Sequence, residues 1–64
     1  MKINGVQKQC PDNLTVSAML EQEGYAREGV AVELNMEIVT KDAYDITVLQ
    51  ENDVIEVVKF MGGG

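Results

Sequence analysis

Short stretches of alternating apolar and polar residues open the chain. They flank Asn4-Gly5, a pair that tolerates positive φ and favours a tight hairpin turn between two strands. Residues 11–13, Pro-Asp-Asn, are typical of a turn, and the proline keeps the residue before it extended. The sequence therefore predicts a short strand pair over residues 2–10, followed by a turn.

The apolar spacing lengthens in the next stretch and becomes helical. One stripe with spacings of i, i+3 and i+4 is formed by Val16, Met19 and Leu20. Thr15 before this stripe is a suitable N-cap, because its hydroxyl can accept a hydrogen bond from a free backbone N–H. Gly24 suits a left-handed conformation at the other end. A two-faced helix is therefore predicted over residues 16–23, with its apolar stripe turned inward.

Strand-like alternation returns beyond the helix. Residues 30–35 alternate in the way typical of a half-buried strand, and residues 37–40 form a second short strand or extended piece. Residues 41–45 are compatible with a loop or with one helical turn carrying Tyr44. After an irregular stretch and a turn, residues 54–60 form the last strand, which is apolar on both faces, as central strands are.

The predicted order is therefore strand, strand, helix, strand, short strand, strand. One helix packed across a small mixed sheet is an α+β layer pair, and sixty-four residues make one domain at most. If the first and last strands lie side by side and parallel, the helix is part of the crossover between them. We predict one α+β domain over residues 1–61, followed by a flexible tail over residues 62–64.

The two faces of the last strand differ in polarity, and the face with a carboxylate should point toward solvent. That face is made of Val54, Glu56, Val58 and Phe60. Ile55 and Val57 on the opposite face are therefore expected to point into the core. Val58 and Phe60, with Met61, would form an apolar patch, and such patches usually mark an interface for a partner. The alternative is that a loop or the first strand covers this patch.

The charge balance excludes some partners. Eleven Asp and Glu residues stand against five Lys and Arg residues, a net charge of −6, and the basic residues are scattered. Nucleic acid and anionic membrane surfaces are poor partners, because clustered cations bind them. The acidity fits a soluble protein whose partners carry a basic docking surface, or it serves solubility alone.

Cys10 is the only cysteine, and the chain has no histidine. An internal disulfide is therefore impossible, and carboxylates with one thiol are a poor ligand set for zinc. No apolar run approaches the ~20 residues of a membrane span, and the N-terminal stretch lacks the apolar part of a signal peptide. With a free thiol, these features predict a cytoplasmic protein.

Candidate catalytic groups are few. The only serine, Ser17, lies within the predicted helix, and no glycine-rich loop precedes a helix to hold phosphate. Cys10 could act as a nucleophile, but no base stands near it in the sequence, so we expect a buried or inert thiol. The sequence therefore predicts no enzyme, no catalytic residue, no metal site and no bound cofactor.

Three glycines, Gly62-Gly63-Gly64, follow the last strand closely. Without side chains to pack, they should form a mobile tail that ends in an ionised carboxylate. A carboxylate on so thin a stalk can enter a narrow channel of another protein, where a Cβ atom would clash. The alternative is a cloning linker, since glycine linkers are common.

Two stretches, VAVELNMEIV at residues 30–39 and LQENDVIEVVKFMGGG at residues 49–64, resemble the ThiS family of sulfur carriers in thiamine biosynthesis. The chain length and the helix start TVSAML at residues 15–20 are similar too. The final Gly63-Gly64 is shared with the MoaD and ubiquitin relatives of that family. The resemblance implies a β-grasp, ubiquitin-like fold.

The resemblance also implies a chemistry for the tail. An E1-like, ThiF-like adenylyltransferase would join the Gly64 carboxylate to AMP from MgATP, so that ATP and magnesium are used by the partner. A sulfur donor would displace AMP and leave a thiocarboxylate, whose sulfur a ThiG-like thiazole synthase would consume. Gly62 and Gly63 would thread the partner's channel, and Val58, Phe60 and Met61 would dock on it.

Three positions depart from the family pattern. Glycine is common in the family where Met36 stands, proline at Thr40, and glycine at Asn52. A two-residue turn at Asn35-Met36 would put methionine at positive φ, so we expect a different turn there. Three alternatives to a thiazole sulfur carrier remain: a molybdopterin-type carrier, a ubiquitin-like protein modifier, and an interaction module with an inert tail.

Overall fold

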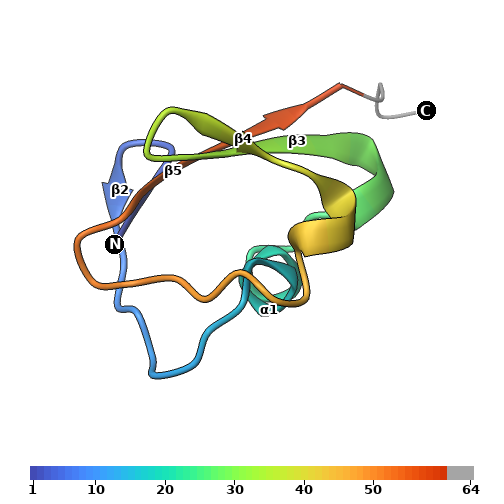
Figure 1. Ribbon diagram of the computed structural model, residues 1–64. Coiled ribbons are helices and arrows are strands. Elements are labelled where there is room, and N and C mark those ends of the chain that lie inside the picture. The colour runs from blue at the N-terminus through green and yellow to red at the C-terminus, as the bar shows by residue number, and fades with distance from the viewer. Residues whose placement is uncertain (61–64) are drawn as a thin grey trace.

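In residues 1–60, five strands form one mixed sheet, and a single α-helix lies across one of its faces (Figure 1). The computed structural model describes residues 1–60, so the predictions for Met61 and for the glycine tail at residues 62–64 lie outside the described residues. The elements are β1 Lys2–Ile3, β2 Val6–Gln7, α1 Val16–Gln22, β3 Val30–Leu34, β4 Glu37–Val39 and β5 Val54–Lys59. Two single 3-10 turns, η1 Arg27–Gly29 and η2 Lys41–Ala43, precede β3 and follow β4.

The last strand, β5, pairs with both halves of the sheet. The strand order is β2-β1-β5-β3-β4, with β5 in the middle. It runs parallel to β1, where Ile3 pairs with Ile55, and antiparallel to β3, where Val32 pairs with Val57. The prediction that this strand is central is therefore confirmed, and the condition for a crossover through the helix is met, since the strand lies parallel to β1. The remaining strands form two hairpins, one on either side of β5.

The helix begins and ends close to the predicted residues. The Thr15 hydroxyl accepts a hydrogen bond from the Ala18 N–H at 3.1 Å, which satisfies one free donor of the first turn. Gly24, with φ of +82°, provides the left-handed residue just beyond the helix. The apolar stripe that the sequence predicted is buried completely. Helix α1 is thus fixed at both ends by local signals and on one face by packing.

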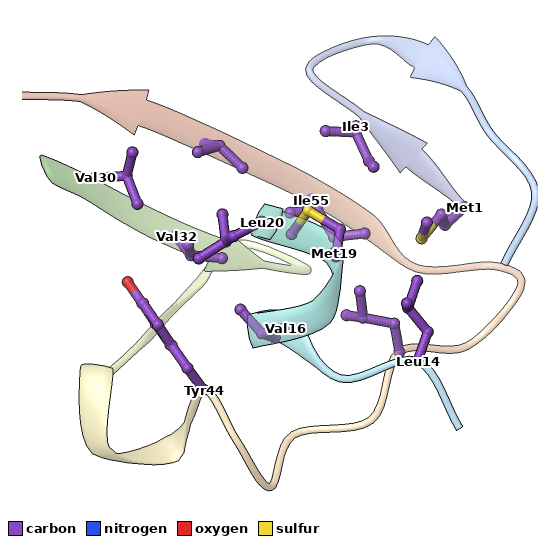
Figure 2. Packing of buried hydrophobic residues seen from close by; sticks show 12 residues of the cluster. Met1, Ile3, Leu14, Val16, Met19, Leu20, Val30, Val32, Tyr44 and Ile55 are labelled. Atoms are coloured by element: carbon purple, nitrogen blue, oxygen red, sulfur yellow. The ribbon is translucent and has the colours of Figure 1, made fainter. Parts of the chain in front are cut away.

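The core lies between α1 and the inner face of the sheet, which is the face turned toward the helix. Figure 2 shows Met19 and Leu20 of the helix beside Val32 and Ile55 of the two central strands. Val57 is also buried, which confirms the prediction that this face of β5 points inward. The remaining core members are Val16 of the helix, Val30 of β3, and residues of the loops and the N-terminal segment: Met1, Ile3, Leu14, Tyr44 and Leu49.

Tyr44 is a large core residue that the sequence pattern did not place. The segment that carries it was compatible with a loop or a helical turn, and the structure shows the turn η2. The Tyr44 side chain is fully buried and lies across the end of the core near Val16 and Val32 (Figure 2). It therefore ties η2 to the core.

The turn at Asn35-Met36 corrects one expectation. Asn35 and Met36 have φ of +52° and +73°, so methionine does occupy a left-handed position, and the expectation of a different turn is wrong. Leu34 pairs with Glu37, which leaves two residues to reverse the chain, and the hairpin turn that matches strand twist needs positive φ at both. The pairing register of β3 and β4 therefore imposes positive φ on Met36, a conformation that methionine disfavours.

Candidate functional site

The outer face of β5, opposite the helix, is apolar toward its C-terminal end. The Val58 side chain is 56% exposed and that of Phe60 58% exposed. Ala31 is the residue paired with Val58 on β3. In residues 1–60 neither a loop nor the first strand covers this patch, so the alternative of a covered patch is wrong. Met61, the third predicted docking residue, lies outside the described residues.

Phe60 is held in place although its ring is largely exposed. Its backbone N–H donates to the Gly29 carbonyl at 3.1 Å, which extends the contacts of β5 by one residue. The Lys41 ammonium lies 5.3 Å from the centroid of the Phe60 ring, within the range of a cation–π contact. The point where the chain leaves the sheet is therefore anchored to both 3-10 turns.

A small polar network of Ser17, Arg27 and Asp45 adjoins the two 3-10 turns. Arg27 pairs with Asp45 at 3.2 Å, and the Ser17 hydroxyl donates to the same carboxylate oxygen. The Ser17 hydrogen bond, followed by the charge of Arg27, lowers the pKa of the Asp45 carboxyl below its usual value. Burial raises the pKa of Tyr44, while Arg27, 5.5 Å above its ring, acts in the opposite direction. These groups hold charges in fixed positions and form no nucleophile–base pair.

Cys10 lies in the segment between β2 and α1. It is half-buried against the core, and its Sγ makes one weak contact, with the Pro11 carbonyl at 3.8 Å. An open hollow of about 650 Å³ runs beside it, lined by Met1, Lys8 and Glu51 among others. No base hydrogen-bonds to this thiol among the described residues. Its inertness stays a prediction.

Two further classes of site can be addressed for residues 1–60. Over this range, histidine, cysteine and carboxylate side chains nowhere gather in a group of three that could hold a metal ion. The one α-helix, seven residues long, is too short to cross a membrane, and no other helix in the described part of the chain is long and apolar enough to do so.

Sequence reasoning missed the basic residues of this site. Arg27 and Lys41 are scattered in the sequence, yet the fold brings Arg27 to the Lys41 carbonyl and Lys41 to the Phe60 ring. Positions 27, 41 and 60 share no periodicity, so no signal in the sequence could have joined them. Val58 and Phe60 were found because strand alternation is local.

A ubiquitin-like β-grasp domain with an anchored, exposed end of its central strand, and with no acid–base pair in its described part, fits the class of small carrier proteins. The comparisons with known proteins agree. The model of the ThiS family matches residues 1–64, and the chain belongs to that family. The family prediction made from the sequence is therefore confirmed.

The individual relatives support the same assignment. The crystal structure of the thiamine biosynthesis protein ThiS from Geobacter metallireducens superposes with a TM-score of 0.80 at 35% identity, covering 98% of this chain and 96% of that one. It confirms the β-grasp fold. The sulfur carrier protein ThiS of Bacillus subtilis is 40% identical over 53 residues, which are 83% of this chain and 80% of that protein.

A second kind of relative is much longer. The thiazole synthase of Magnetococcus marinus is 44% identical over 62 residues, which are 97% of this chain but only 19% of that protein. The thiazole synthase of Paramagnetospirillum magneticum matches in the same proportions, at 40% identity. A stretch similar to this whole domain thus forms about a fifth of each of these proteins.

Proposed function

We propose that this chain carries sulfur as a thiocarboxylate on Gly64 and donates it for thiazole formation in thiamine biosynthesis. The observation that carries the proposal is the family match, which runs through the terminal glycines. The described part of the chain adds support, because its hydroxyl–carboxylate hydrogen bonds, Ser17 to Asp45 and Thr40 to Asp42, are exposed and typical of surface contacts. The reacting group is then the carboxylate of the final glycine.

The chemistry explains why a partner is needed. A carboxylate is a poor electrophile, because its leaving group would be an oxide. Attack of a carboxylate oxygen on the α-phosphorus of ATP releases pyrophosphate and leaves an acyl adenylate, whose leaving group is AMP. A sulfur nucleophile from a donor then attacks the acyl carbon and displaces AMP. The partner, a ThiF-like adenylyltransferase, uses ATP and Mg²⁺; the carrier supplies the carboxylate and a stalk, Gly62-Gly63, without Cβ atoms.

A ThiG-like thiazole synthase is proposed as the acceptor of the sulfur. In two relatives named thiazole synthase, a stretch similar to this domain belongs to the same polypeptide as the rest of the protein. Sharing one polypeptide keeps a carrier at a high effective concentration near its acceptor. These relatives thus support a working relation between a carrier of this kind and a thiazole synthase.

Mass spectrometry tests the proposed chemistry. The full chain is incubated with a ThiF-like adenylyltransferase from the same organism, MgATP and a sulfur donor. We expect exchange of one oxygen for sulfur, located on the C-terminal peptide. Deletion of Gly64, or extension of the chain by one residue, should abolish the exchange, whereas Cys10→Ser should leave it unchanged.

Two results would contradict the proposal. One is sulfur on Cys10 instead of the C-terminal peptide, and the other is undiminished exchange without Gly64. Covalent adducts of the wild-type chain on lysines of other proteins would favour the protein modifier instead.

Val58, Phe60 and Met61 are proposed as the docking patch for the adenylyltransferase. Exposed aromatic side chains at the centre of an interface commonly contribute much of its binding energy. Phe60→Ala should therefore weaken binding, measured by calorimetry, with little change in the melting temperature. Val54→Ala, on the same face at the other end of β5 and 44% exposed, is the control. Equal losses for both variants would place the docking patch elsewhere.

A further inference from the structure

The two 3-10 turns are tied to each other by a reciprocal pair of hydrogen bonds. Arg27 of η1 donates from Nη2 to the Lys41 carbonyl of η2 at 3.0 Å. Lys41 of η2 donates from Nζ to the Glu28 carbonyl of η1 at 3.1 Å. In each turn a cationic side chain thus donates to a backbone carbonyl of the other turn. The partners are fourteen and thirteen positions apart in the sequence.

The end of β5 joins this pair of turns. Phe60 donates its N–H to the Gly29 carbonyl of η1, and its ring lies below the ammonium of Lys41. Lys41 contacts both η1 and the ring of Phe60. We call Lys41, Phe60 and the η1 carbonyls of Glu28 and Gly29 the tail-root brace.

The brace is fixed to the core through Tyr44. This buried residue follows η2 directly, and Arg27 lies over its ring while pairing with Asp45. The guanidinium is therefore held by the Tyr44 ring and by the Asp45 carboxylate, and it also donates to the Lys41 carbonyl. The packing of Tyr44 in the core sets the position of η2, and Lys41, which belongs to η2, in turn holds the Phe60 ring.

The charge of Lys41 is used differently from the charges of its neighbours. Within residues 1–60, ion pairs with carboxylates are formed by Lys8 and Arg27, whereas Lys41 contacts a carbonyl oxygen and an aromatic face. A lysine that served only to balance the negative charge of the domain would lie near a carboxylate. This ammonium lies instead at the last described residue before the glycines.

We propose that Lys41 is a positioning residue for the docking patch, in which it holds the Phe60 ring against η1. This inference rests on the proposed function, because the position of the Phe60 ring matters only if an adenylyltransferase docks on it. A side chain that is already held in place loses less conformational freedom when a partner binds it. The effect belongs to binding and should be the same in the ground state and in the transition state.

The test compares lysine variants as substrates of the adenylation reaction. The rate of pyrophosphate release is measured at varied carrier concentration, which gives KM and kcat for each variant. Lys41→Met removes the cation and keeps the length of the side chain. A cation–π contact at an exposed site corresponds to a factor of about 2–5 in an equilibrium. We expect the KM for the carrier to rise by about that factor with kcat unchanged, the pattern of lost uniform binding. Lys41→Arg, which can both stack and donate, should restore the wild-type KM.

Lys59→Met is the matched control. It removes the same charge one residue from Phe60, but Lys59 has neither the ring nor an η1 carbonyl as a partner in residues 1–60. Its KM should stay at the wild-type value. NMR checks the contact itself: the ring current of Phe60 should move the Lys41 ε-methylene protons upfield, and Phe60→Leu should abolish that shift.

The outcomes separate the positioning role from the proposed function. If the wild-type chain releases pyrophosphate and Lys41→Met has an unchanged KM, the positioning role is overturned and the proposed function stands. Equal KM increases for Lys41→Met and Lys59→Met, failure of Lys41→Arg to restore the KM, or absence of the upfield shift would also overturn it. No pyrophosphate release from the wild-type chain overturns the proposed function, and the positioning role with it.

Discussion

Two hairpin turns reverse the chain with the same backbone and different residues. The first, Asn4-Gly5, has φ of +50° and +83°, and the second, Asn35-Met36, has φ of +52° and +73°. Each connects two strands that pair up to the turn itself. The first turn uses the residue that adopts positive φ most readily, and the second uses an unbranched side chain for which such a backbone costs energy.

The asparagine explains why both turns form. Asn4 accepts a hydrogen bond from the Val57 N–H at 2.7 Å and donates to the Val57 carbonyl at 3.2 Å. Asn35 accepts from the Val54 N–H at 3.0 Å and donates to the Asp53 carboxylate at 2.9 Å. Both side chains thus reach the backbone of the central strand β5, one from each flanking hairpin.

The second turn residues, Gly5 and Met36, differ, and this difference indicates which interactions determine the conformation of such a turn. Met36 is 91% exposed, so no packing offsets its backbone strain. The Cβ position of Gly5 is also open, with no atom within 4 Å. The two positions therefore differ in residue but not in surroundings. Strand register and the preceding asparagine determine the turn, and the second residue changes only its stability.

Asn4→Ala should have the largest effect on this comparison. It removes two hydrogen bonds to a partly buried strand backbone and places alanine at positive φ. We expect a loss of about 2–3 kcal/mol in the free energy of unfolding, measured by urea denaturation. Asn4→Asp keeps the acceptor and the turn preference and should lose less. An unchanged midpoint for Asn4→Ala would show that the side-chain bonds to β5 contribute nothing.

Asn35→Ala should come next, with a loss of about 1–2 kcal/mol. Its side-chain bonds are exposed to solvent, and the Asn35 backbone N–H still donates to the Val54 carbonyl at 2.8 Å. Water can replace exposed partners more easily than buried ones. A loss larger than that of Asn4→Ala would mean that the two asparagines do not play equivalent roles.

The smallest effects are expected from exchanging the second residues. Gly5→Met should lower the free energy of unfolding by about 0.5–1 kcal/mol, and Met36→Gly should raise it by a similar amount. The strain of a side chain at positive φ is partly balanced by the larger entropy that glycine loses on folding, which keeps both values small. Thermal melts of the two variants and of the double variant measure this balance. The same sign for both substitutions would show that the surroundings of the two turns differ after all.

Most of the fold could be predicted because its signals are local. The Asn4-Gly5 turn, the Thr15 cap and the core face of β5 each follow from a few neighbouring residues. The Asn35-Met36 turn could not, because local preference argues against it and only pairing between β3 and β4 requires it. Local rules fail where a tertiary constraint is stronger than a residue's own preference.

The candidate site divides in the same way. Val58 and Phe60 could be assigned to the outer face from alternation, since Glu56 marks that face. Lys41 and Arg27 could not be connected with them, because the contacts depend on where Tyr44 is buried. The role of Gly64 stays a prediction, which rests on the resemblance to the ThiS family and on the position of the three glycines after the last strand.

The central place of β5 has a consequence for how the chain folds. Residues 2 and 3 pair with residues 54 and 55, so β1 cannot find its parallel neighbour until nearly the whole domain has been synthesised. The two hairpins do not pair with each other, and an isolated two-stranded hairpin is marginal in water. Each hairpin therefore becomes stable only when β5, which is synthesised after the other four strands, pairs with it. Closing so long a loop slows the search, and one late encounter completes both halves of the sheet at once.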